Sequence, residues 1–186
     1  MMKLVKPSMD YLPGFKAALE TGWSPDNVRL EIAAREQLAK IAKDAEGFVA
    51  SLDDREAKGD LITLPDGTQV KRLPGYFRWM WDGEFCGSIG FRWSPGTSSL
   101  PPHCLGHIGY SVVPWKRGKG YATSALGQIL PEAKAEGLTY VELTTDPDNV
   151  ASQQVIAANG GLMLGPRTEA AAYGNKTSLL WRINLG

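Results

Sequence analysis

The chain has 186 residues, with 20 Lys and Arg against 20 Asp and Glu, so its formal net charge at pH 7 is zero. This length favours one domain that buries roughly 70% of its unfolded surface. A content of 22% charged residues at zero net charge argues against an intrinsically disordered chain. The charge balance argues against a dedicated nucleic-acid binder, because contacts with phosphates demand an excess of Lys and Arg.

The N-terminal helical part is predicted over about residues 8–58. Residues Ser8–Glu20 favour one helix, with a proline near its first turn. The run Ser24-Pro25-Asp26 then has the order typical of a second helix start: a hydroxyl cap, a proline and an acid. We expect that second helix, interrupted at Gly47, to continue to about Lys58.

A β-hairpin and an alternation of strands and helices are predicted for the rest of the chain. Asp82-Gly83 lies between two aromatic and β-branched runs, which is a strong hairpin signal. Strands are predicted over Lys3–Val5, 76–81, 84–93, Leu105–Val113, Thr139–Thr145, 162–169 and 177–184, and further helices over Ala122–Glu136 and Asn149–Asn159. This order predicts an α/β (α+β mixed) domain, residues 1–186, whose mixed, mostly antiparallel sheet of about seven strands is flanked by about four helices.

The apolar segments and the cysteines bear on the cellular compartment of the protein. Residues Met1–Ser8 contain no apolar run of the kind found in a signal peptide, and no apolar segment is long enough to span a membrane. The two cysteines, Cys86 and Cys104, allow one disulfide at most, and a chain of this size does not depend on it. We therefore expect a cytoplasmic protein with reduced cysteines and no membrane partner.

The clearest local motif is the basic glycine turn over residues 115–120, Trp-Lys-Arg-Gly-Lys-Gly, between a strand and a helix. Glycines let the backbone approach an anion, and the free N–H groups of a helix start point at it. A nucleotide P-loop is excluded, because Lys119 is followed by Gly120 and not by Ser or Thr. A dinucleotide fingerprint stays open, with Thr123 as its third small residue. An ordinary turn with solvated cations also stays open.

The context of this turn adds a family resemblance. Arg117, Gly120 and Ala122 fill the fixed positions of the pattern Q/R-x-x-G-x-G/A, and Asn149 precedes Ser152 by three residues at the start of the next predicted helix. With these motifs, residues 106–161 resemble the GNAT superfamily of N-acetyltransferases, and within it a bacterial group of predicted acetyltransferases. The resemblance implies a GNAT-like acyl-CoA N-acyltransferase fold with a CoA-binding core over about residues 105–161.

The resemblance also implies a cosubstrate, acetyl-CoA, and no metal. It places acetyl-CoA in a V-shaped gap where the strands 105–113 and 139–145 separate, with the pyrophosphate on the glycine turn and the pantetheine arm along the first strand. The cofactor-binding residues implied in this way are Ser111, Val112, Val113, Arg117, Gly118, Lys119, Gly120, Tyr121, Ala122, Thr123, Asn149 and Ser152. Homodimers are common in the family, and the acceptor is open between a small-molecule amine and a peptide amine.

The implied reaction is direct attack of a neutral primary amine on the thioester. The resemblance assigns the oxyanion donor to a backbone N–H near Val112 or Val113, freed by a β-bulge. A general base is required, because an amine with a pKa near ~10.4 is mostly protonated at neutral pH. The candidates for this base are Glu142, His107 and Asp146.

The general acid is where the chain departs from the family. Many members carry a Tyr seven residues after the Asn, and this chain has Ile156 there. Ser152 or Tyr173 could protonate the leaving thiolate, but we expect the thiolate to leave unassisted into water and the cationic turn. The same departure keeps a second function open, a non-catalytic acyl-CoA-binding or sensor domain.

Overall fold

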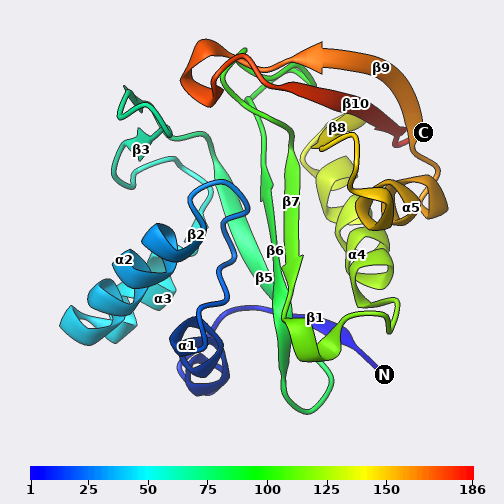
Figure 1. Cartoon of the computed structure of the whole chain (residues 1–186). Helices are drawn as coiled ribbons and strands as arrows, with labels where there is room; N and C mark the ends of the chain where they lie inside the picture. Colours follow the sequence, from blue (N-terminus) through cyan, green and yellow to red (C-terminus); the bar gives the residue numbers. More distant parts are fainter.

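The computed structural model describes residues 1–186 and contains two antiparallel sheets with helices around them (Figure 1). The strands are β1 (Lys3–Val5), β2 (Asp53–Asp54), β3 (Ile62–Thr63), β4 (Gln69–Val70), β5 (Gly75–Trp81), β6 (Phe85–Arg92), β7 (Ile108–Val112), β8 (Tyr140–Thr145), β9 (Leu162–Thr168) and β10 (Thr177–Asn184). The helices are α1 (Leu12–Glu20), α2 (Leu30–Lys43), α3 (Ala45–Ser51), α4 (Tyr121–Ala135) and α5 (Val150–Ala158).

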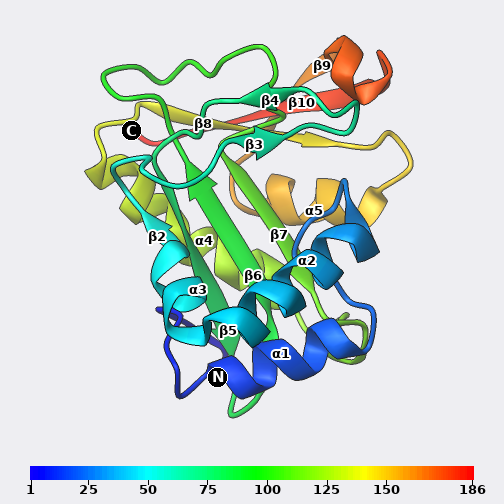
Figure 2. The same cartoon turned by 90° about the vertical axis from the view of Figure 1, so that its left-hand side faces the viewer.

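The larger sheet has the order β1-β5-β6-β7, with β2 paired to β5, and the smaller sheet has the order β8-β10-β9. The strands β3 and β4 form a separate two-stranded ribbon. Helices α1, α2 and α3 cover one face of the larger sheet, while α4 covers the other face (Figures 1 and 2). This layering confirms the predicted α/β class.

Two hydrophobic clusters fill the space on either side of the larger sheet, because successive side chains of a strand point to opposite faces. Met80 of β5 belongs to the cluster that includes Leu126 and Ile129 of α4. Its neighbour Trp79 belongs to the cluster with Phe15 of α1, and the two rings stack with centroids 4.7 Å apart. One face of the sheet therefore packs against α4 and the other against α1.

The predicted hairpin is confirmed, but the N-terminal helices differ from the prediction. The side chain of Asp26 accepts hydrogen bonds from the N–H groups of Val28 and Arg29, both at 2.8 Å, so a turn forms there and α2 begins only at Leu30. The break falls at Asp44, whose side chain caps α3, and not at Gly47. The predicted second helix is thus two helices, which raises the helix count from four to five.

The strands also differ in number and in pairing. Three two-residue strands, β2, β3 and β4, were not predicted, because such short segments carry no clear periodicity. The strands form two antiparallel sheets, because β7 and β8 form no ladder; this is the separation of strands 105–113 and 139–145 that the family resemblance implies. Where they approach each other, the N–H of His107 donates to the carbonyl of Glu142 at 2.8 Å.

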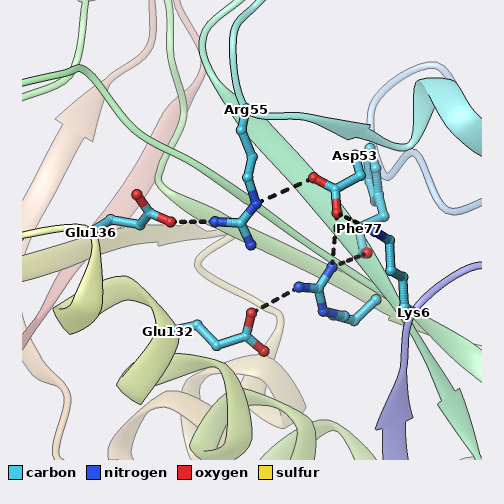
Figure 3. Close-up of polar contacts among 7 residues, drawn as sticks. Lys6, Asp53, Arg55, Phe77, Glu132 and Glu136 are labelled. Atoms are coloured by element: carbon cyan, nitrogen blue, oxygen red, sulfur yellow. Dashed lines mark hydrogen bonds and ion pairs between the residues drawn. The ribbon is translucent and has the colours of Figure 1, made fainter.

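An ion-pair network joins the N-terminal half of the chain to the end of α4 (Figure 3). Arg55 pairs with Asp53 of β2 and with Glu136, and Arg78 of β5 lies 3.0 Å from Glu132 of α4. These side chains are partly exposed, so each pair contributes little energy, on the order of 1 kcal/mol or less. The network mainly fixes where α4 lies on the sheet.

We predict that Trp79→Ala lowers the midpoint of thermal unfolding by about 6–20 °C, because removing a buried aromatic side chain costs about 3–5 kcal/mol. Trp79 is 0% exposed and Trp115 is 52% exposed, so Trp115→Ala is the matched control, with little expected change. Thermal unfolding followed by circular dichroism measures both. Equal losses in the two variants would contradict the role of Trp79 in the core.

Candidate active site

The outer edge of β7 has no partner strand. The N–H of Val113 donates to the carbonyl of Cys86 at 3.0 Å, and the register between β6 and β7 is continuous. Antiparallel alternation therefore turns the N–H and C=O groups of Tyr110 and Val112 away from β6. The predicted β-bulge is absent, and the Val113 N–H is occupied, so ordinary alternation leaves the Val112 N–H as the outward donor.

The glycine turn lies at one end of this edge and presents a row of free donors. The N–H groups of residues 118–123 have no acceptor within the protein, and the first N–H after them, that of Ser124, bonds to the carbonyl of Gly120 at 3.0 Å. Gly118 and Gly120 both have φ of +73°, and no heavy atom lies within 4 Å of the position of a Cβ at either. This open row at the start of α4 fits a pyrophosphate.

The positive charge of the turn is smaller than its sequence indicates. Lys116 Nζ lies 3.0 Å from both carboxylate oxygens of Asp82 and 3.0 Å from Glu84, at the tip of the β5–β6 hairpin. The hydroxyl of Tyr121 donates to Asp82 at 2.6 Å, and these bonds hold the pKa of Asp82 well below its usual range. The hairpin tip thus fixes the turn, and Lys116 is not free to bind a ligand.

Two cations of the turn remain available for an anion. Lys119 has no ion pair, and Arg117 donates from Nε to the carbonyl of Val112 at 3.2 Å. Since Arg117 contacts a backbone group and no carboxylate, its charge is not compensated.

The first turn of α5 contacts β7 through two hydroxyl groups. Asn149 caps this helix by accepting the N–H of Ser152 at 3.1 Å, and the Ser152 hydroxyl lies 2.8 Å from the hydroxyl of Tyr110. Sequence reasoning missed Tyr110, although its place on the predicted strand opposite the predicted α5 was a usable signal.

Each of the three predicted bases already has a partner within the protein. Glu142 accepts from Arg182 Nη2 at 2.7 Å, and Asp146 pairs with Lys176 at 2.6 Å. His107 is 0% exposed, and its Nδ1 accepts the N–H of Glu142 at 2.9 Å. The nitrogen that a base would use is therefore occupied in His107, and the two carboxylates are bound to cations.

A cavity of about 400 Å³ lies beside Gly109 of β7. The segment before α2, α2 itself and the β3–β4 ribbon also line it. Its floor contains Gly90 and Gly109, which are neighbours across β6 and β7. The ring of Phe77 covers Gly90, whereas no heavy atom lies within 4 Å of the position of a Cβ at Gly109. The absence of a side chain at Gly109 thus creates space beside the β7 edge.

The segment before α2 closes one wall of this cavity. Trp23 Nε1 donates to the Ser111 hydroxyl at 3.0 Å, and Asn27 Nδ2 donates to the carbonyl of Tyr110 at 2.9 Å. Asp26, between them in sequence, lines the cavity. The structure therefore places a carboxylate near the free edge of β7 that the sequence did not indicate.

A family model described as an acetyltransferase (GNAT) domain matches residues 27–161. The chain belongs to this GNAT family. The match assigns an acetyltransferase domain to the chain and decides against the dinucleotide interpretation.

Solved structures of GNAT acetyltransferases share this fold. The chain is similar to the microcin C7 self-immunity acetyltransferase MccE in complex with acetyl-CoA and AMP, with 13% identity, a TM-score of 0.62, and coverage of 98% of this chain and 92% of that one. It is also similar to the Salmonella typhimurium acetyl transferase that modifies the N-terminal serine of ribosomal protein L7/L12, with 12% identity, a TM-score of 0.62, and coverage of 98% and 94%. No curated protein sequence matches the chain.

Two further observations concern metals and membranes. No group of three or more His, Cys, Asp or Glu side chains is placed to hold a metal ion. None of the helices combines the length and the apolar character that crossing a bilayer requires.

We predict that His107 makes the protein less stable in acid. Burial lowers the pKa of His107 to about 4 from its usual 6.5, so the unfolded chain takes up a proton at a higher pH than the folded one. The stability due to neutral His107 is present above pH 6.5 and is lost as the pH falls toward 4, by about 3 kcal/mol or about 6–12 °C in the unfolding midpoint.

The unfolding midpoint between pH 7 and pH 4 measures this effect. In His107→Asn the pH dependence should be flatter than in the native protein. The other histidine, His103, is half-buried, and His103→Asn is the control that should keep the native dependence. An unchanged dependence in His107→Asn would show that another group causes the acid sensitivity.

Proposed function

We propose that the protein transfers the acetyl group of acetyl-CoA to a primary amine that enters the cavity beside Gly109, by direct attack on the thioester. The observation that carries the proposal is the free edge of β7, which runs from the cavity at Gly109 toward the open row of N–H groups at residues 118–123. A donor on one side and an acceptor on the other would meet at the backbone of Tyr110 and Val112.

The chain's residues would hold acetyl-CoA at three places. The N–H groups of residues 118–123, with Lys119 and Arg117, would bind the pyrophosphate. The outward carbonyl of Val112 would accept from an N–H of the amide-bearing arm, as in strand pairing, after Arg117 leaves this carbonyl. Acetyl-CoA supplies the thioester, and the outward Val112 N–H is the donor best placed to stabilise an oxyanion.

We propose Asp26 as the group that accepts the amine proton, directly or through water. One oxygen of its carboxylate accepts two backbone N–H groups, which orients the side chain, and the other oxygen has no partner within the protein. Asp26 lines the cavity, unlike Glu142, His107 and Asp146. Its neighbour Asn27 contacts the Tyr110 carbonyl, which brings this segment to the proposed point of attack.

The second role open to this chain, a sensor without turnover, is separated from the enzyme by one pair of measurements. Acetyl-CoA and CoA at 100 times their dissociation constants should raise the unfolding midpoint by roughly 5–11 °C, and NAD should not. Thiol release with a panel of primary amines then reports turnover. Binding without thiol release from any amine would support the sensor.

In the same assay, Asp26→Asn should lower kcat/KM for the amine more than about tenfold while leaving CoA affinity unchanged. Asn keeps an oxygen that can accept the two N–H groups, so the turn before α2 should survive. Glu142→Gln is the matched control, because Glu142 is a carboxylate outside the cavity. A pH–rate profile that is the same in Asp26→Asn as in the native protein would contradict a role for Asp26 as base.

The hydroxyl pair of Tyr110 and Ser152 offers a route for protonating the leaving thiolate. Tyr173 is a weaker candidate, because its hydroxyl already donates to the carbonyl of His103 at 3.1 Å. The contact of 2.8 Å between Tyr110 and Ser152 supports Ser152 as donor, with Tyr110 restoring its proton. This route replaces the unassisted departure that the sequence favours.

Tyr110→Phe and Ser152→Ala should each lower kcat more than about tenfold and leave the dissociation constant of CoA unchanged. Tyr173→Phe is the matched control. Steady-state kinetics and calorimetric titration with CoA measure the two quantities. If all three variants stay within about threefold of the native kcat, the thiolate leaves unassisted.

A further inference from the structure

We infer that the acceptor carries an anionic group close to its amine, and that Arg92 binds this group in the cavity. The inference rests on the proposed function, since it names the class of amine that the same cavity takes. Four observations support it: the orientation of Arg92, the pairing of the other cavity charges, the position of Tyr173 and the glycine floor.

Arg92 is held at the cavity by its Nε, and its other two nitrogens are free. Nε donates to the carbonyl of Gly106 at 2.8 Å, and Arg92 lines the cavity together with Gly106. Neither terminal nitrogen donates to a group of the protein, and no carboxylate lies within ion-pair distance. On β6, Arg92 follows Gly90 by two residues, so it projects from the same face as the cavity floor.

The other charged groups of the cavity leave a positive excess. Arg29 is neutralised by both oxygens of Glu36, at 2.9 and 2.6 Å, and Arg72 lies 3.7 Å from Asp54. The remaining charged groups that line the cavity are Asp26 on one side and Arg92 and Lys71 on the other. Lys71 is exposed and has no ion pair. A ligand that carries only a positive charge would therefore leave two cations without a partner.

Tyr173 lines the cavity together with the two opposite charges, Asp26 and Arg92. Its hydroxyl is fixed on the carbonyl of His103, and it lines the same cavity. Burial raises the pKa of Tyr173, the charge of Arg92 opposes that shift, and the charge of Asp26 adds to it. Asp26, Arg92 and Tyr173 line the same cavity of about 400 Å³, so an amine at Asp26 and an anion at Arg92 would belong to one compact ligand.

The chemistry of Arg92 defines the ligand class. The planar guanidinium binds a carboxylate or a phosphate through two parallel hydrogen bonds, and charged bonds of this kind are the strong ones. The open floor at Gly109 leaves room for a compact ligand in a cavity of about 400 Å³. The structure thus assigns to the acceptor a primary amine with a carboxylate or phosphate a few atoms away.

The experiment compares matched amines that differ only in the anionic group. The pairs are L-alanine and L-alanine amide, O-phosphoethanolamine and ethanolamine, and the peptide amides Ser-Glu and Ser-Gln, each with acetyl-CoA in the thiol-release assay. In the native protein, the anionic member of at least one pair should have a kcat/KM at least about tenfold higher. The pair that responds distinguishes a carboxylate from a phosphate.

Three variants test whether Arg92 causes the preference. Arg92→Gln should reduce the ratio within the responding pair to less than about threefold and leave the KM for acetyl-CoA unchanged. Arg92→Lys should restore part of the ratio, because the charge returns without the fork. Arg35→Gln, which removes an exposed cation outside the cavity, should keep the native ratio. A native ratio near one in every pair, or the same ratio in Arg92→Gln, overturns the inference.

A binding measurement separates failure of this inference from failure of the proposed function. If no amine releases thiol, the CoA-loaded protein is titrated with the same pairs and its unfolding midpoint is followed. A larger shift from the anionic member that is lost in Arg92→Gln supports the anion site even without turnover. Equal shifts within every pair overturn it.

Discussion

The free outer edge of β7 is the constraint on which the rest of the structure depends. A strand with one paired and one unpaired edge presents every second N–H and C=O group to whatever lies beside it. Here β8 pairs with β10, and Glu142 of β8 bonds to His107 just before β7, while β7 itself has no strand partner on this edge, so the backbone of Tyr110 and Val112 stays unpaired by any strand. In the chain's own structure, Asn27 and Arg117 bond to the two carbonyls on that edge. The glycine turn and the cavity can act on one reaction because both lie beside this edge.

Electrostatics distinguish the two sides of this edge. On the glycine turn, the hairpin tip takes up Lys116, so most of the attraction for an anion comes from backbone N–H groups at the start of α4. In the cavity, internal ion pairs neutralise Arg29 and Arg72 and leave Arg92 free. A simple count of Lys and Arg would have included Lys116 in the glycine turn and Arg29 and Arg72 in the cavity, although all three are neutralised by carboxylates. Charge that matters for binding is the charge left after internal pairing.

The candidates for the general base show that residue type alone does not identify a catalytic group. His107, Glu142 and Asp146 lie on or beside the predicted strands of the cleft, and each has the chemistry of a base. His107 is buried, and its Nδ1 accepts a backbone N–H. The carboxylates of Glu142 and Asp146 pair with Arg182 and Lys176. The open carboxylate, Asp26, comes from the N-terminal part, about a hundred residues earlier in the chain. No local pattern relates that segment to β7.

The sequence by itself determined the order of the elements from the hairpin to β10, the anion-binding form of the glycine turn and the family. Those features depend on short-range causes: strand alternation, the Asp-Gly turn, glycines at positive φ and a helix cap at Asn149. Only the tertiary structure decided that Asp82 takes up Lys116, that Tyr110 meets Ser152, and that Asp26 and Arg92 line one cavity. Each of these contacts joins residues far apart in the chain, and their geometry depends on how the two sheets and their helices pack, which no single segment encodes.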